Sequence, residues 1–330
     1  MSQNPGFTLR TKAQNLLANL DRIQRRTGFW FRSLGLFREK NPDRNLFSVS
    51  PAGSNPLYAG EISRGSAGLT GGELAKFRTE GWAGPFPFLT QRGSDQAEKI
   101  YRRIYRKFKS PERGDLQKPG AFSERPWSKS MHAYVPEFYD LAAHPAVTDK
   151  VADILGPDLM VWSLTLNLYR PGERHRWHVD IEHKKWKGVT VFLGLRNITE
   201  RSTLKVISRS HRMGSMPQEL GIDEDGSALA ACRSVEKEAL LTAIPLREGE
   251  FFIFDGLLWH GSRNETFRTR GAMIIQYSRP DQPIALPMNT TPPVQWHPTP
   301  PPCVLVKGED RWGVNRLVPR PGSPGGNRPF

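Results

Sequence analysis

A histidine and an aspartate stand two residues apart in the segment Arg176-Trp177-His178-Val179-Asp180. The segment follows a strand-like run at residues 161–170 and a Pro171-Gly172 turn. Side chains two residues apart on an extended chain point to the same side, so this imidazole and this carboxylate can bind one metal ion. With eight histidines in 330 residues, one such triplet is expected by chance. The triplet becomes a candidate metal site only if the chain supplies a third ligand.

The third ligand that the sequence offers is His260, which lies just after a strand-like run at residues 250–255. Two neutral imidazoles and one carboxylate, with the other coordination positions open, form the facial triad of non-haem iron(II) oxygenases. The open positions matter because a chelating cosubstrate and O2 must both reach the iron. The spacing therefore predicts an iron site whose three ligands come from two separate strands.

Two arginines follow the candidate triad at the start of the next predicted strand. Arg270 stands ten residues beyond His260, and Arg268 precedes it by two residues. A guanidinium is planar and always charged, and it binds a carboxylate through two parallel hydrogen bonds. An arginine on this strand is therefore suited to hold the far carboxylate of a dicarboxylate cosubstrate that chelates the metal.

The elements that must position these side chains begin after residue 158. Strands are predicted at residues 160–170, 188–196, 203–208, 250–255 and 271–279. Several short strands without helices between them, after a helical half, predict an antiparallel β-sandwich or jelly roll flanked by helices. A long, polar and partly helical insertion at 212–247 is typical of lids and binding loops.

The helices are predicted in the N-terminal half of the chain. A threonine cap with Glu73 in a capping pattern precedes a short helix. Residues 96–108 predict a charged amphipathic helix, and residues 134–155 predict one or two helices that end at Gly156.

Three regions are expected along the chain. Residues 1–68 form a basic extension with a leucine-bearing amphipathic segment, which would contact a membrane or an acidic carrier, or pack on the main domain. Residues 69–280 form the main domain. Residues 281–330 form a Pro-rich basic tail, much of it extended or disordered.

The bulk composition limits the functional classes. The chain has a formal net charge of +14, which favours anionic partners, but it carries none of the motifs typical of nucleic-acid binding. No run of about 18 apolar residues predicts a transmembrane helix, and the N-terminus lacks the apolar core of a secretory signal. Two widely spaced cysteines fit a reducing compartment, so we expect a soluble cytoplasmic protein.

In these features the chain resembles the phytanoyl-CoA dioxygenase-like family of iron(II)/2-oxoglutarate oxygenases, over about residues 69–280. The resemblance is carried, in this order, by LTGGELAKFRTEGWAGPFPFL, HPAVTDKVADILGPDLMVW, the His178-Val179-Asp180 triplet, LKVISRSHR, and LREGEFFIFDGLLWHGSRN with Arg270. It implies a double-stranded β-helix, that is, an α+β chain with a mainly β, cupin-like jelly-roll core flanked by N-terminal helices.

The resemblance also implies the cofactor and the site. Iron(II) would be bound by three residues, His178, Asp180 and His260. The cosubstrates would be O2 and 2-oxoglutarate, and Arg270 would anchor 2-oxoglutarate with help from the Ser262 hydroxyl and from Asn167 on the strand before the triplet. The implied reaction is hydroxylation, desaturation or ring closure of a small-molecule metabolite or natural-product intermediate.

Two comparisons within the resemblance bear on the reaction and the substrate. Related halogenases are similar too, notably near Gly84-Pro85-Phe86, but they carry a small residue where this chain has Asp180, so an oxygenase is expected. The LKVISRSHR segment departs from the usual pattern, because Ser202-Thr203 and Ser208-Arg209 replace a glycine and a Pro-Gly. Three arginines near that loop leave open an anionic or carrier-tethered substrate, beside plain surface charge: Arg196, Arg201 and Arg209.

Other interpretations remain open at this point. One alternative is a non-catalytic β-sandwich binding protein with a vestigial metal site and a basic docking surface. The complete triad favours the enzyme over this alternative. His175 and His178 would form a zinc pair on a helix, but the β pattern favours a loop or substrate-contact role for His175. Trp177 and Trp259, which precede the two metal histidines, fit either pocket walls or core packing.

Overall fold

The computed structural model describes residues 61–62, 68–108, 129–182, 186–286 and 300–323. The chain divides into two compact units, Met1–Arg44 and Asn45–Phe330, and every described residue belongs to the second. The amphipathic segment predicted near the N-terminus lies outside the described residues. Within them, no helix has both the length and the apolar character that crossing a membrane requires.

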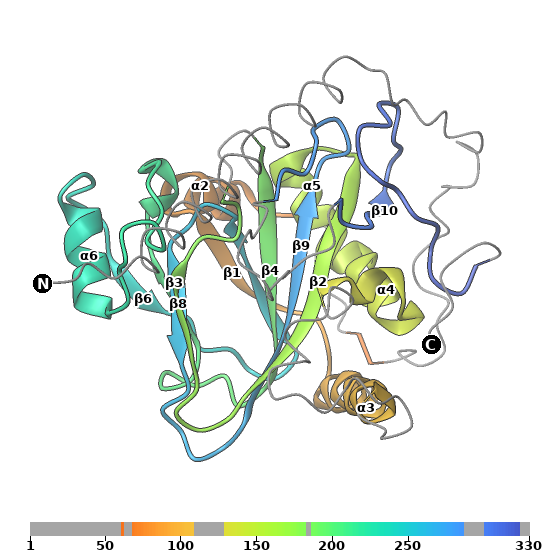
Figure 1. Cartoon of the computed structure of the whole chain (residues 1–330), viewed down its shortest axis with the longest axis horizontal. Helices are drawn as coiled ribbons and strands as arrows, with labels where there is room; N and C mark the ends of the chain where they lie inside the picture. Colours follow the sequence, from red (N-terminus) through yellow and green to blue (C-terminus); the bar gives the residue numbers. More distant parts are fainter. Residues whose placement is uncertain (1–60, 63–67, 109–128, 183–185, 287–299, 324–330) are drawn as a thin grey trace, which may run out of the picture. The chain divides into compact units, whose positions relative to one another are not determined.

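Two antiparallel sheets form the core of the second unit (Figure 1). The larger sheet has six strands in the order β1 (Trp82–Pro87), β7 (Glu250–Asp255), β4 (Gly188–Arg196), β9 (Arg270–Ser278), β2 (Leu159–Tyr169) and β10 (Val304–Lys307). The smaller sheet has four strands in the order β3 (Arg174–His178), β8 (His260–Arg263), β5 (Leu204–Ile207) and β6 (Leu241–Ala243). This arrangement confirms the predicted jelly-roll class.

The larger sheet is buried on both faces, which explains why its central strands are almost continuously hydrophobic. Alternate residues of β7 point to opposite faces. Phe252 and Phe254 pack in a cluster with Leu204 and Val206 of the smaller sheet. Phe251 and the other outward residues of β7 pack with the helices instead. The first cluster is the interior of the jelly roll, where the candidate site lies.

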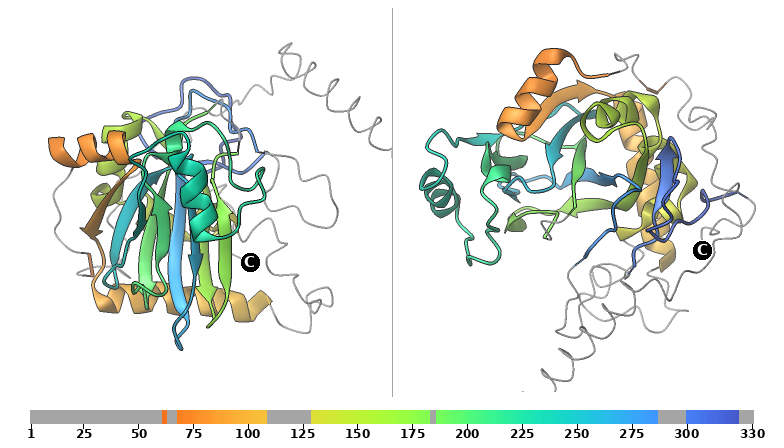
Figure 2. Two further views of the ribbon diagram at one scale, coloured as in Figure 1. Left: turned by 90° about the vertical axis from the view of Figure 1, so that its left-hand side faces the viewer. Right: turned by 90° about the horizontal axis from the view of Figure 1, so that it is seen from above.

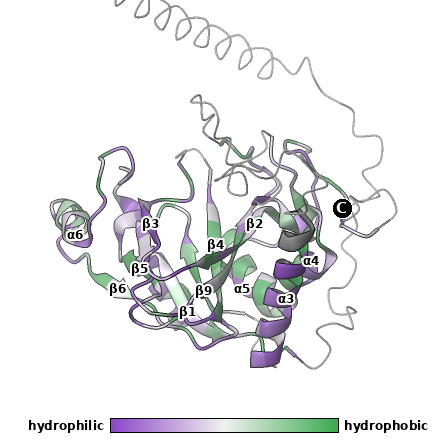
Figure 3. Cartoon of the chain, turned by 60° about the horizontal axis from the view of Figure 1, so that its bottom comes forward, coloured by the Kyte–Doolittle hydropathy of each residue, from purple (hydrophilic) through white to green (hydrophobic). Residues whose placement is uncertain are grey.

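Helices cover the outer face of the larger sheet. The predicted capping box is present, because the Thr70 hydroxyl accepts from the Glu73 N–H and the Glu73 carboxylate accepts from the Thr70 N–H. The helix bounds are α2 (Gly71–Glu80), α3 (Gln91–Phe108), α4 (Pro136–Ala142) and α5 (Pro145–Leu155). Figure 2 shows α3, which begins five residues before its predicted start, crossing at one end of the large sheet. Figure 3 shows that α3 is mostly hydrophilic, whereas the central strands are hydrophobic.

Part of the predicted Pro-rich C-terminal tail packs on the larger sheet. The structure describes residues 300–323, where β10 pairs with β2 through Val304 and Leu305, which are both buried. Pro-rich composition hides this strand in the sequence, because only four residues, Val304–Lys307, carry the β pattern. Residues 287–299 and 324–330 lie outside the described residues.

The insertion at 212–247 contributes helix α6 (Asp225–Arg233) and strand β6. Cys232 and Ala228 of α6 pack in one cluster with Trp177 and Trp259. The left-hand view of Figure 2 shows α6 in front of the strands. Helix α6 therefore forms an outer layer of the smaller sheet, and the lid role suggested for the insertion stays a prediction.

Candidate metal centre

Two strands of the smaller sheet bring the predicted metal ligands together. His178 ends β3, His260 begins β8, and the two residues are paired in the antiparallel ladder. Asp180 lies two residues beyond the end of β3, and its Oδ1 is 3.6 Å from Nε2 of each histidine. One ligand atom from each residue lies within 4.8 Å of the others. Among the described residues this is the group that can hold a metal ion.

Each histidine is oriented by its own backbone. Nδ1 of His178 lies 2.8 Å from the Arg176 carbonyl oxygen, and Nδ1 of His260 lies 2.8 Å from the Leu258 carbonyl oxygen. An Nδ1–H that donates to a carbonyl leaves Nε2 unprotonated and free to bind a metal. Both Nε2 atoms face Asp180, so the donor set is two imidazole nitrogens and one carboxylate oxygen. This set suits iron(II) and leaves other coordination positions open.

The Asp180 carboxylate is held from its far side. Thr190, on β4 of the larger sheet, donates its hydroxyl to Asp180 Oδ2 over 2.6 Å, so Oδ1 remains directed at the histidines. Burial alone would raise the pKa of Asp180, but His260 and His178 outweigh burial and hold that pKa well below its usual range. Burial, followed by the nearby His260, lowers the pKa of His178. The centre therefore favours an ionised Asp180 carboxylate beside a neutral His178 imidazole, which is the form that binds a metal.

Arg270 is buried in the jelly-roll interior at the start of β9, with 2% of its surface exposed. Its Nη1 donates to the Ser202 carbonyl oxygen over 2.9 Å, and its Cζ lies 4.3 Å from the centre of the Tyr169 ring. Burial lowers the pKa of Arg270 to about 10, so the guanidinium is still charged at neutral pH. Its Nε is buried without a hydrogen-bond partner, and so is the hydroxyl oxygen of Ser262. These two orphaned polar atoms fit the carboxylate of a bound dicarboxylate.

The sequence matches the phytanoyl-CoA dioxygenase (PhyH) family model over residues 77–272, which is more than half of the chain. The chain belongs to this family. It is therefore a 2-oxoglutarate-dependent non-haem iron oxygenase, which uses iron(II), 2-oxoglutarate and O2. No curated protein matches the sequence.

Two solved structures share the fold of this dioxygenase-family member. The apo form of the non-haem monooxygenase ThoJ is 24% identical, with a TM-score of 0.55, and the match covers 76% of this chain and 88% of that one. The structure of CytC3 with Fe(II) and α-ketoglutarate is 17% identical, with a TM-score of 0.56, and the match covers 80% of this chain and 99% of that one.

The remaining predicted residues of the dioxygenase occupy different positions. Asn167 pairs with Ala272 in the β2–β9 ladder and shares a strand face with Tyr169, two residues on, so it lies on the interior face of the larger sheet. Arg268 is exposed, in contrast to the buried Arg270. Burial thus distinguishes the two arginines that the sequence placed side by side.

The His175 ring lies against that of His178, tilted by 53°, without joining the metal centre. Its ring centroid lies 4.1 Å from that of His178, and 6.2 Å from that of Tyr169. It lies on strand β3 instead of a helix, and the metal-binding group formed by the described residues does not include it. The geometry therefore gives no zinc pair, and His175 contacts His178 from outside the ligand set.

The sequence did not predict three residues that lie near the centre or near Arg270. Thr190 supports Asp180, and its signal was a polar residue within a hydrophobic strand. Tyr169 covers the Arg270 guanidinium. Lys129 lies close enough to Asp180 and His175 to interact with both electrostatically, and burial lowers the pKa of Lys129 against the opposing effect of Asp180. Nothing in the polar loop that contains Lys129 predicts this placement.

Proposed function

We propose that the protein hydroxylates a small organic molecule, such as a natural-product intermediate, with iron(II) bound by three residues, His178, Asp180 and His260. Arg270 anchors 2-oxoglutarate, with the Ser262 hydroxyl as second donor and Asn167 on the same interior face. The observation that carries this proposal is the convergence of two Nε2 atoms and one carboxylate oxygen within 4.8 Å. Each of the three side chains is oriented by a hydrogen bond at its other polar atom, Nδ1 of the histidines and Oδ2 of Asp180.

When bound, iron(II) supplies the oxidising chemistry by which 2-oxoglutarate, O2 and a C–H bond become succinate, CO2 and a C–OH group. The chain's own residues bind and orient the reactants. His178 and His260 present neutral Nε2 atoms because their Nδ1 atoms are bonded to carbonyl oxygens. Asp180 contributes the negative charge, and Thr190 keeps its second oxygen away from the metal.

Arg270 orients the cosubstrate. Its Nη1 is already bonded to the Ser202 carbonyl, and its flat face is against Tyr169, so the direction of the unpaired Nε is fixed before the ligand arrives. A preorganised donor costs little ordering on binding. The Ser262 hydroxyl lies on β8 two residues after His260, so it faces the same side as that ligand.

The carboxylate of Asp180 favours hydroxylation, because it occupies the position that a halide would need in the related halogenases.

The positive charges near the centre bear on whether the substrate is anionic or carrier-tethered. Arg209 is held by Glu80 and Glu238, and Arg196 is held by Glu98, so these arginines are already paired. Lys129, in contrast, interacts with the centre itself and is the cation we propose for an anionic group there.

A visible charge-transfer band tests the proposal. Anaerobic addition of iron(II) and 2-oxoglutarate should produce the band in the wild-type protein, and Asp180→Ala should abolish it. The matched control is Asp281→Ala, which removes an aspartate that pairs with Arg279 far along the chain from the triad, and which should keep the band. Absence of the band in the wild type, together with absence of succinate in the presence of candidate substrates, would overturn the assignment.

A further inference from the structure

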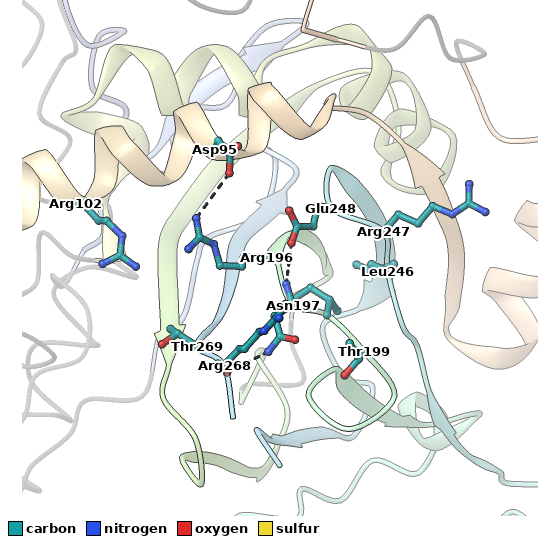
Figure 4. Close-up of a pocket in the computed structure, with 11 residues that line it drawn as sticks. Asp95, Arg102, Arg196, Asn197, Thr199, Leu246, Arg247, Glu248, Arg268 and Thr269 are labelled. Carbon is teal, nitrogen blue, oxygen red and sulfur yellow. Dashed lines mark hydrogen bonds and ion pairs between the residues drawn. The ribbon is translucent and has the colours of Figure 1, made fainter. Parts of the chain in front are cut away.

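A cavity of about 700 Å³ lies between α3 and the loops that follow β4 and precede β7 and β9 (Figure 4). It is bounded by α3, by the end of β4, and by the loops that precede β7 and β9. Small-molecule sites usually have volumes of about 300–1,000 Å³, so this cavity is large enough for a metabolite. None of the predicted iron or 2-oxoglutarate residues lines it.

The cavity is distinct from the iron centre. Strand β4 connects the two, because Thr190 near its start contacts Asp180 and Arg196 at its end lines the cavity. Six residues of extended strand span about 20 Å. A ligand in the cavity therefore does not meet the iron.

Four arginines line the cavity: Arg102, Arg196, Arg247 and Arg268. Figure 4 shows Arg102 and Arg247 on its two sides, with Arg196 and Arg268 between them. Among the described residues, two lining carboxylates and the buried Glu98 face these four positive charges, so positive charge is in excess there.

The carboxylates are not shared equally among the arginines. Glu98 pairs with Arg102 and Arg196, and Asp95 lies 3.7 Å from Arg196. Glu248 accepts from neutral amides, those of the Asn197 backbone and the Gln91 side chain. Within the part of the chain that the structure describes, no carboxylate forms an ion pair with Arg247 or Arg268. These two guanidinium groups are the ones with donors to offer an anion.

The wall of the cavity between them is rigid and partly apolar. Asn197 has a left-handed backbone (φ 54°), and its side chain donates to Thr266 and to the Arg268 carbonyl oxygen. A non-glycine residue keeps this conformation only where its surroundings hold it. Buried Ile198 and Leu246 supply an apolar surface. A charged rim over an apolar floor suits an organic anion better than a bare inorganic one.

We propose that this cavity is a second ligand site, which binds a compact organic anion carrying carboxylate or phosphate groups through Arg247 and Arg268. The proposal does not rest on the hydroxylase assignment, because it concerns a different surface and its test needs no turnover. Carboxylate and phosphate ligands of this kind share an anionic group on a short carbon skeleton. Glycerol 3-phosphate and propane-1,2,3-tricarboxylate represent the two sources of that chemistry.

Calorimetric titration of each probe into the full-length, metal-free protein tests the site. We expect one bound molecule of at least one probe, with affinity that falls as salt is added. Each of Arg247→Gln and Arg268→Gln should weaken that binding about tenfold, because each removes a charge-assisted hydrogen bond. The matched control is Arg311→Gln, which changes an exposed arginine paired with Glu309 and should leave the affinity unchanged.

Two outcomes would overturn the proposal. One is that neither probe binds. The other is that a probe binds with the same affinity to the Arg247→Gln and Arg268→Gln double variant, which would place it elsewhere, for example at Arg270. Circular dichroism of the variants checks folding, and both arginines are exposed, so their replacement leaves the core intact. A preference for one probe identifies the source of the anionic group.

Discussion

Thr190 offers a sharp test of how the larger sheet supports the metal centre. Thr190→Val keeps the shape of the side chain and removes the hydroxyl that donates to Asp180 Oδ2 over 2.6 Å. Thr190 has 1% of its surface exposed, so the valine methyl group that replaces the hydroxyl excludes water from Oδ2 unless the surroundings rearrange. The variant leaves a carboxylate oxygen without its donor and lets the carboxylate rotate away from the histidines.

The expected loss follows from the charge on the acceptor. A hydrogen bond to a charged group contributes about 1.5–3 kcal/mol, so iron(II) affinity should fall about 10- to 100-fold. Anaerobic titration of iron(II), followed by calorimetry, measures this directly. The 2-oxoglutarate charge-transfer band should persist at saturating iron, because His178, His260 and Asp180 are all still present.

Thr203→Val is the matched control for losing a buried hydroxyl. Thr203 is equally buried, but it donates to the Ile244 carbonyl oxygen and touches no metal ligand. It should lower the free energy of unfolding and leave iron affinity unchanged. Unchanged iron affinity in Thr190→Val, or an equal loss in Thr203→Val, would refute the idea that the hydroxyl acts by orienting Asp180.

Three further predictions concern other buried polar groups. Arg270→Ala should raise the KM for 2-oxoglutarate far more than Arg268→Ala, because only Arg270 is buried beside the centre; the opposite ranking in steady-state kinetics would contradict its role. Burial lowers the pKa of His132 from 6.5 to about 4. The contribution of the neutral His132 to the free energy of unfolding is therefore fully present above pH 6.5, and about 3 kcal/mol of it is lost as the pH falls to 4. Urea unfolding at pH 7 and pH 4 should show a smaller loss in His132→Gln, and an equal loss would refute this. Tyr277→Phe removes a buried hydroxyl that donates over 2.9 Å to a backbone carbonyl, and it should cost about 1 kcal/mol in urea unfolding with iron affinity unchanged.

The central strands of the larger sheet were predictable from the sequence because their local pattern and their environment agree. β4 and β7 have the predicted bounds, 188–196 and 250–255. Both have a largely apolar interior that is rich in β-branched and aromatic residues and buried on two faces. For such strands the apolar pattern of the sequence extends over the same residues as the pairing with neighbouring strands, so the bounds can be predicted from the sequence.

The strands that carry the candidate metal ligands were harder to predict. β8 comprises only His260–Arg263, with the sequence HGSR, which has no β-branched or aromatic residue. It forms because His260 pairs with both β3 and β5. Such pairing is a tertiary effect that a local pattern does not contain. The same holds for Lys129, whose nearness to Asp180 depends on a chain segment far from the triplet in sequence.

The tryptophans beside the two metal histidines explain how these short strands keep their register. Successive side chains on a strand alternate between faces, so Trp177 points outward where His178 points inward, and Trp259 does the same beside His260. Trp177 donates its indole N–H to Asp225, and Trp259 donates to the Ser215 carbonyl, both within the insertion. A slip of one residue would exchange imidazole for indole on each face. The insertion therefore positions both histidines from the opposite side of the sheet, although it supplies no metal ligand itself.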